Sequence, residues 1–154
     1  MSDPSISDLA SKYREIIGIE SPSEVWEVEK GHIRMHADAV GDTNPLWRDE
    51  EYARTTQYGT IIAPPFLLID AGLVKFVDKL VDMAPDMANI NGGTEVDFYG
   101  PMKVGDVITS VAKLLDVKEK SGKSGDMIFL TVEVAYTNQT DELVTRSRTT
   151  FIRR

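Results

Sequence analysis

A carboxylate and an amide stand two residues apart in the segment Gly41-Asp-Thr-Asn-Pro45. Gly41 is well placed to end a preceding helix, because glycine adopts the left-handed conformation at little steric cost. The Asp42 carboxylate and the Asn44 amide are then expected on a bend, where a carboxylate can move a proton to or from a bound molecule. This spacing predicts a site of acid–base chemistry.

Backbone N–H groups are expected to face this bend from a second segment, Tyr58-Gly-Thr-Ile-Ile-Ala-Pro-Pro-Phe66. Its two prolines favour the start of a helix, because the first N–H groups of a helix have no partner within it. Such N–H groups can bind a carbonyl oxygen while a nearby carboxylate moves a proton. The two segments together suit the chemistry of an acyl thioester.

The hydrophobic pattern ahead of Pro85 predicts the elements that position these residues. It indicates a helix capped by Ser7, a half-buried strand over residues 24–29, a helix over 30–40, an irregular or short helical cover over 49–57 and a long helix over 66–83. The helix over 30–40 delivers Asp42 to the bend. The long helix is apolar on every side over residues 66–69, which predicts that its first turns are buried.

Beyond Pro85 the apolar residues recur with a period of two, which is typical of strands. Strands are expected over residues 95–98, 107–117, 127–136 and 143–152, with short turns between them. Long strands joined by short turns form an antiparallel sheet. A long buried helix followed by such strands predicts an α+β fold in which the sheet wraps around the helix.

Length and composition predict a single domain over residues 1–154, with residues 1–20 as an N-terminal tail and helix, because 154 residues with 42% hydrophobic side chains fit one core. The formal net charge of −8 argues against binding to nucleic acid or to an anionic membrane surface. Without cysteine there is neither a disulfide framework nor thiolate chemistry. No leader segment and no run near the roughly 20 apolar residues of a membrane span is present, so a cytoplasmic location is expected.

Three ordered blocks carry a resemblance to a known family. They read Gly41-Asp-Thr-Asn-Pro-Leu-Trp47, Tyr58-Gly-Thr-Ile-Ile-Ala-Pro-Pro-Phe66 and Phe98-Tyr-Gly-Pro-Met-Lys-Val-Gly-Asp106. From about Glu24 to Arg154 the chain resembles the MaoC-like acyl dehydratases of hot-dog fold, and most of all their N-terminal-type dehydratase domain. The resemblance implies (R)-specific hydration of trans-2-enoyl thioesters, or the reverse dehydration. Coenzyme A or acyl carrier protein would carry the acyl group, and no separate cofactor is implied.

The resemblance also assigns roles to the residues of the bend. The family pattern is Asp-x-Asn-Pro-x-His, so Asp42 matches the catalytic aspartate and Asn44 the supporting asparagine. Trp47 stands at the histidine position, and an indole donates a hydrogen bond but cannot relay a proton near neutral pH. Loss of one acid–base partner typically costs a factor of roughly 10² to 10⁴ in rate. Family members with an aromatic residue here tend to form one half of a two-part enzyme.

Further residues are expected to contact the substrate. Trp47 would narrow the pocket or pack against the acyl chain, because an indole is large and mostly apolar. The oxyanion-binding backbone of the family matches four residues at the expected start of the central helix: Ala63, Pro64, Pro65 and Phe66. His36 falls close enough before the bend to face the pocket and could replace the missing base.

Several of these residues also have plainer interpretations. Asp42 and Asn44 could be turn formers, since both residue types bond to their own backbone at bends. His32 and His36 lie one helical turn apart, but a catalytic zinc site usually has three protein ligands and no third ligand has suitable spacing, so no metal site is expected. The segment over 121–125 superficially resembles a phosphate loop, yet it joins two strands and is better read as a hairpin.

Four arginines form the main basic cluster of the sequence, and they could meet a coenzyme A phosphate or simply charge a strand edge: Arg146, Arg148, Arg153 and Arg154.

The function predicted from these features is that of an enoyl-thioester hydratase or 3-hydroxyacyl-thioester dehydratase of fatty acid or acyl-CoA metabolism, active alone or as one subunit of a heteromer. One alternative is a non-catalytic acyl-binding partner subunit, and another is a hot-dog thioesterase. An open sheet around one helix leaves a face and an edge to be covered, so a homodimer or a heteromer with a second hot-dog subunit is expected.

Overall fold

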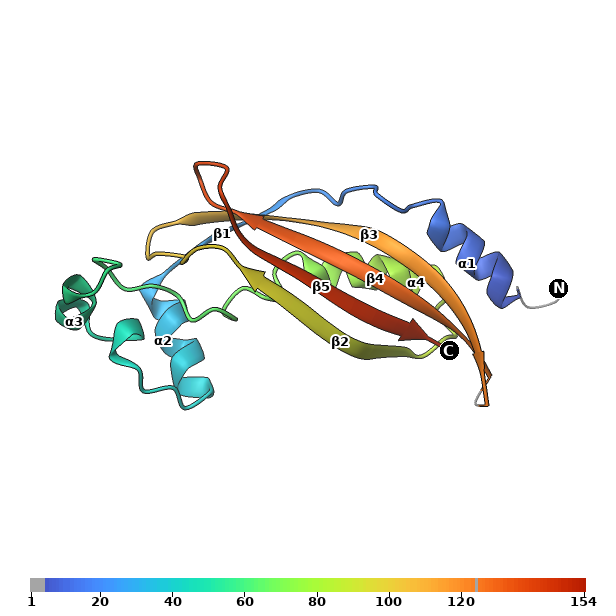
Figure 1. Cartoon of the computed structure of the whole chain (residues 1–154), viewed down its shortest axis with the longest axis horizontal. Coiled ribbons are helices and arrows are strands. Elements are labelled where there is room, and N and C mark those ends of the chain that lie inside the picture. The colour runs from blue at the N-terminus through green and yellow to red at the C-terminus, as the bar shows by residue number, and fades with distance from the viewer. Residues whose placement is uncertain (1–4, 124) are drawn as a thin grey trace.

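Four strands from the second half of the chain and one short strand from its first half form a five-stranded antiparallel sheet, in the order β1-β3-β4-β5-β2 (Figure 1). The computed structural model describes residues 5–123 and 125–154. The strands are β1 (Glu24–Glu27), β2 (Asn89–Phe98), β3 (Val107–Gly122), β4 (Gly125–Thr137) and β5 (Leu143–Arg153). The predicted antiparallel sheet is confirmed. β3 and β4 form the expected hairpin, in which Gly122 pairs with Gly125, and Ser124 between them lies outside the described residues.

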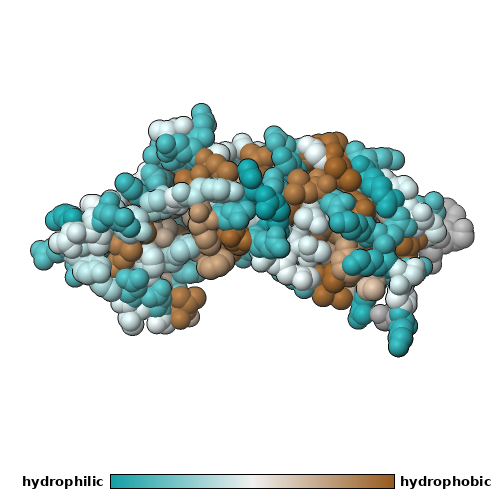
Figure 2. Space-filling model, in the orientation of Figure 1, coloured by the Kyte–Doolittle hydropathy of each residue, from teal (hydrophilic) through white to brown (hydrophobic). Residues whose placement is uncertain are grey.

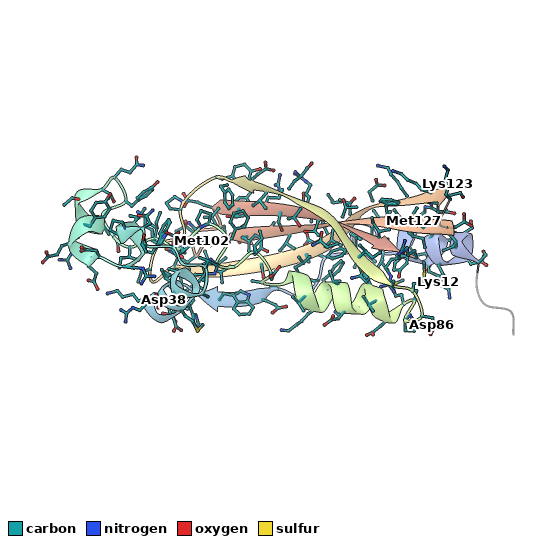
Figure 3. All side chains as sticks on the ribbon, turned by 90° about the horizontal axis from the view of Figure 1, so that it is seen from below. Lys12, Asp38, Asp86, Met102, Lys123 and Met127 are labelled. Carbon is teal, nitrogen blue, oxygen red and sulfur yellow. The ribbon has the colours of Figure 1, made fainter. Side chains whose placement is uncertain are left out.

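The helices are α1 (Ile6–Arg14), α2 (Lys30–Ala39), the 3₁₀ turn η1 (Pro45–Trp47), α3 (Glu50–Thr55) and α4 (Leu73–Asp82). α4 lies against one face of this sheet, α2, η1 and α3 lie beyond one end of it, and α1 lies near the opposite end (Figure 1). Seen from below, α4 runs along one face of the curved sheet (Figure 3). α2, η1 and α3 project together beyond the end of the sheet (Figure 1).

The core lies between α4 and the sheet. Side chains that face α4 alternate along β4 and are fully buried: Ile128, Leu130, Val132 and Val134. Leu73, Phe76 and Leu80 of α4 belong to the same hydrophobic cluster. The opposite face of the sheet carries hydrophilic and hydrophobic residues interspersed (Figure 2).

In the described part of the chain, no helix is long and apolar enough to cross a membrane.

The central helix is shorter than its sequence pattern predicts. α4 begins at Leu73, and the residues from Pro65 to Gly72 form successive turns. Phe66 is 53% exposed, so the prediction that these first turns are buried is wrong. Gly72 explains the break, because its φ of 75° is left-handed and a Cβ there would lie 2.6 Å from Ser110 Oγ. A continuous helix cannot pass through such a residue.

The N-terminal helix begins earlier than predicted and is anchored to α4. Ser5, not Ser7, is its cap: the Ser5 hydroxyl accepts from the Asp8 N–H at 3.2 Å, and Asp8 accepts in return from the Ser5 N–H. This reciprocal capping box satisfies two N–H groups of the first turn. Tyr13 is fully buried and donates to the Leu80 carbonyl at 2.7 Å, which joins α1 to the end of α4.

Candidate functional site

The bend after α2 holds Asp42 with both carboxylate oxygens hydrogen-bonded. Gly41, with φ 71°, follows the helix, and the Asp42 N–H donates to the Ala37 carbonyl at 2.8 Å. Oδ1 of Asp42 accepts from the Asn44 N–H at 2.9 Å. Oδ2 accepts from the Trp47 indole Nε1 at 2.7 Å. The structure therefore brings Asp42 and Trp47 into direct contact, and the indole is held as a donor only.

Asn44 shapes the bend through a local contact. Its side-chain oxygen accepts from the Leu46 N–H at 3.0 Å and caps η1. The residue itself is exposed. Its visible role is that of a turn former, and a supporting role in catalysis stays a prediction.

The surroundings of Asp42 favour its ionised form. The Asn44 N–H contributes most to lowering the pKa of Asp42, followed by the Trp47 indole, and the Arg48 and His36 side chains add to the effect. Hydrogen bonds and positive charges stabilise a carboxylate relative to its protonated form, and here they outweigh partial desolvation. Asp42 is thus a carboxylate near neutral pH.

Arg48 links the bend to α2 through its guanidinium group. The sequence analysis did not identify this residue. Its Nε and Nη2 donate to the Asp42 carbonyl at 3.2 and 3.0 Å. Nη2 also lies 2.6 Å from Asp38 Oδ1 in the last turn of α2, a position labelled in Figure 3. The pairing arises only when the bend closes, so helical or strand spacing does not reveal it.

The four residues expected to supply oxyanion donors supply fewer than predicted. The Ala63 N–H is engaged with the Met102 carbonyl at 2.7 Å, and Pro64 and Pro65 have no N–H. Phe66 alone keeps an N–H that donates to nothing among the described residues. It stands in the turns ahead of α4, so the predicted helix N-terminus at this place is wrong. The Phe66 ring packs edge-on against Phe98 with centroids 5.5 Å apart.

Three hollows surround the segment over residues 62–70. The first, called here the Thr145 cleft, measures about 290 Å³ and lies between residues 62–65 and 98–102, with Thr145 in its wall. The second, of about 380 Å³, lies between the turns ahead of α4 and β2. The third, of about 350 Å³, lies between α2 and the turns and is lined by His36 and Leu67 among others.

The structure does not gather all predicted site residues in one hollow. Asp42, Asn44 and Trp47 line none of these three. His36 is half-buried on α2, close enough to Asp42 for its charge to act on the carboxylate. One chain therefore brings together Asp42, Trp47 and His36, while Ala63 and Pro65 line a separate cleft.

The remaining candidates are also separated. No group of three metal-ligating side chains occurs within residues 5–123 and 125–154. Arg146 and Arg148 lie on the sheet face away from α4, where both approach the Glu133 carboxylate at 3.7 and 3.1 Å. Arg153 is buried on the other face and donates to the Val81 and Ala84 carbonyls. The expectation of one basic cluster is therefore wrong, because even and odd positions of a strand face opposite ways.

The chain is similar in sequence to known proteins. The family described as "FAS1-like, dehydratase domain region" matches residues 15–147. A UPF0336 protein of Thermobifida fusca (strain YX) is 32% identical over 117 residues, which cover 74% of this chain and 76% of that protein. A "Probable enoyl-CoA hydratase alpha subunit" of Thermomonospora curvata is 28% identical over 138 residues, covering 79% of this chain and 43% of that protein.

Two solved structures share the architecture. A MaoC-like dehydratase from Rhodospirillum rubrum superposes with a TM-score of 0.67 at 25% identity, covering 90% of this chain and 93% of that one. A chain of the ChsH1–ChsH2 complex from Mycobacterium tuberculosis gives a TM-score of 0.80 at 22% identity, covering 96% and 92%. With the five-stranded antiparallel sheet over α4, these likenesses confirm the predicted hot-dog fold.

Proposed function

This chain belongs to the FAS1-like dehydratase family, the MaoC-like hot-dog hydratases and dehydratases, and we propose that it is one subunit of a two-part enzyme. The reaction would be hydration of a trans-2-enoyl thioester or the reverse dehydration of a 3-hydroxyacyl thioester. Coenzyme A or acyl carrier protein would carry the acyl group. The observation that carries the proposal is the 2.7 Å contact from the Trp47 indole to Asp42, at the position where the family pattern has histidine.

Asp42 can perform half of the proton chemistry. In hydration, water adds to C3 of the enoyl group and loses a proton, while C2 gains a proton and the thioester oxygen carries the developing negative charge. The ionised Asp42 can orient the water and accept its proton. Each carboxylate oxygen already accepts one hydrogen bond and has a further lone pair free for that water.

A second group must share the proton transfer, and Trp47 cannot supply it. The indole N–H is a donor without acceptor capacity near neutral pH. His36 is a candidate within the chain because its charge reaches Asp42. A partner subunit with an intact Asp-x-Asn-Pro-x-His pattern is the proposed main source. The alpha-subunit name of the Thermomonospora curvata relative supports a divided enzyme.

The sheet offers an edge for that partner. β2 pairs with β5 on one side, and in the described chain no strand pairs with its other side. Free N–H and C=O groups along an edge strand are a template for pairing with another chain. Phe66, Phe98 and Tyr99 near this edge are 53%, 47% and 55% exposed. We propose that a second hot-dog subunit, identical or different, covers them.

The test is purification of the chain with and without its co-purifying neighbours, followed by hydration assays on crotonyl-CoA and a bulkier enoyl-CoA. The chain alone should be a poor hydratase, and addition of the partner should raise the rate by roughly 10² or more. Full activity of the chain alone would refute the division into two parts. Absence of both turnover and thioester binding from every combination would refute the proposed reaction.

A second candidate is a non-catalytic acyl-binding subunit of such an enzyme. It is favoured by the hydrogen bonds that both Asp42 oxygens already accept within the chain. In that case Asp42 would only shape the bend. Asp42→Asn in the assembled enzyme would then leave the rate of hydration unchanged.

A further inference from the structure

The Thr145 hydroxyl is buried without a hydrogen-bond partner. Thr145 lies on the α4-facing side of β5 and is 2% exposed, and its Oγ1 bonds to nothing among the described residues. Its cross-strand neighbours explain this. Phe98 on β2 has no acceptor in its ring, and the Tyr136 hydroxyl on β4 donates instead to the Ile69 carbonyl at 2.6 Å.

An isolated buried hydroxyl destabilises the folded chain, because it loses water without gaining a partner. Most buried polar atoms in native structures are paired, so each exception calls for a physical reason. Valine would fill nearly the same space and has an equally good strand preference. The hydroxyl is therefore a cost to the ligand-free chain, which a bound molecule with an acceptor could offset.

Thr145 is one of the residues in the wall of the Thr145 cleft, which is a built site. Its two sides are held together by backbone pairing: the Ala63 N–H donates to the Met102 carbonyl at 2.7 Å, and the Val104 N–H to the Ile61 carbonyl at 3.1 Å. Among the residues that the structure describes, no charged side chain lines the cleft. About 290 Å³ of mostly apolar space suits a short acyl chain, near the lower end of small-molecule pockets.

We propose that this cleft receives the acyl end of a thioester and that the Thr145 hydroxyl donates a hydrogen bond to the thioester carbonyl oxygen. The inference rests on the proposed acyl-thioester function. The Thr145 hydroxyl would also compensate for the small number of backbone donors beside the cleft, because the Ala63 N–H is already hydrogen-bonded and two prolines follow it. A side-chain hydroxyl takes the place of an amide that this backbone does not offer.

The test compares two ligands that differ in the carbonyl alone: butyryl-CoA, an unreactive thioester, and S-butyl-CoA, the thioether without the oxygen. Thr145→Val should weaken binding of butyryl-CoA by about 3- to 10-fold, the effect of one neutral hydrogen bond. Binding of S-butyl-CoA should stay within about twofold. Thr145→Ser keeps the hydroxyl and should keep the wild-type preference for the thioester.

Stability gives a second readout that does not depend on any ligand. Removing an unpaired buried hydroxyl should raise the Tm of the ligand-free Thr145→Val chain by about 2–4 °C. The matched control is Thr150→Val, a half-buried threonine on the opposite face of the same strand. It should leave the preference between the two ligands unchanged.

Failure of the role proposed for Thr145 and failure of the proposed acyl-thioester function would give different results. Equal loss of both ligands in Thr145→Val, or a lowered Tm of the free variant, would overturn the role of Thr145 and leave the proposed reaction standing. A wild-type chain that binds neither ligand would overturn both the role of Thr145 and the proposed acyl-thioester function.

Discussion

Replacing Trp47 with histidine should turn a pure donor beside Asp42 into a group that can donate, accept and relay a proton. The indole Nε1 lies 2.7 Å from Asp42 Oδ2, so a ring nitrogen at this position is already within the reach that proton transfer needs. A positioned acid–base group contributes roughly 10² to 10⁴ in rate. We expect a gain near the lower limit, about 10²-fold in kcat for the chain alone, because the smaller ring is less tightly held.

The assay follows the loss of the conjugated enoyl absorbance of crotonyl-CoA. In an Asp42→Asn background the gain from Trp47→His should disappear, because the two groups act as one unit. Trp47→Phe is the control for space, since it removes the indole N–H without adding a base. An equal gain in Trp47→Phe, or none in a folded Trp47→His chain that still binds substrate, would refute the reasoning.

Two further changes test the backbone turn and the bend. Gly72→Ala should lower the free energy of unfolding in urea by at least about 1–2 kcal/mol, because φ is 75° at this residue and a Cβ would clash with Ser110 Oγ. Gly31→Ala is the control, because a Cβ there meets open space and should cost no stability. Equal effects of the two variants would contradict this explanation of the turn at Gly72. Arg48→Gln should raise the pKa of Asp42, because the guanidinium helps to lower it, so the acid limb of the pH–rate profile should move to higher pH. An unmoved acid limb would show that Arg48 does not act on Asp42.

Local sequence patterns predicted the helices and strands whose conformation depends on residues nearby in the sequence. Period-two alternation gave the antiparallel strands, and the helix ahead of Gly41 ends within a residue of its predicted limit. The Asp42 bend follows from the same local chemistry. The resemblance placed Trp47 at the histidine position, but the hydrogen bond from its indole to Asp42 appeared only in the structure.

Several of the wrong predictions depend on contacts between distant segments. The apolar run before α4 is helical by periodicity, but Gly72 must approach Ser110 of β3 in a left-handed conformation, and that breaks the helix. The Ala63 amide was expected to be free, yet it pairs with Met102. Thr145 gave no signal in the sequence, because a threonine in a strand is ordinary until its neighbours are known.

The most direct test of the account is the effect of Asp42→Asn on the enzyme assembled with its natural partner. Because Asp42 is the ionised group proposed to take the proton of the attacking water, the variant should hydrate crotonyl-CoA at least about 10²-fold more slowly while the assembly stays intact. Size-exclusion chromatography of the complex is the control for assembly. An intact complex that hydrates crotonyl-CoA at the wild-type rate would contradict the account and place the chemistry in the partner alone.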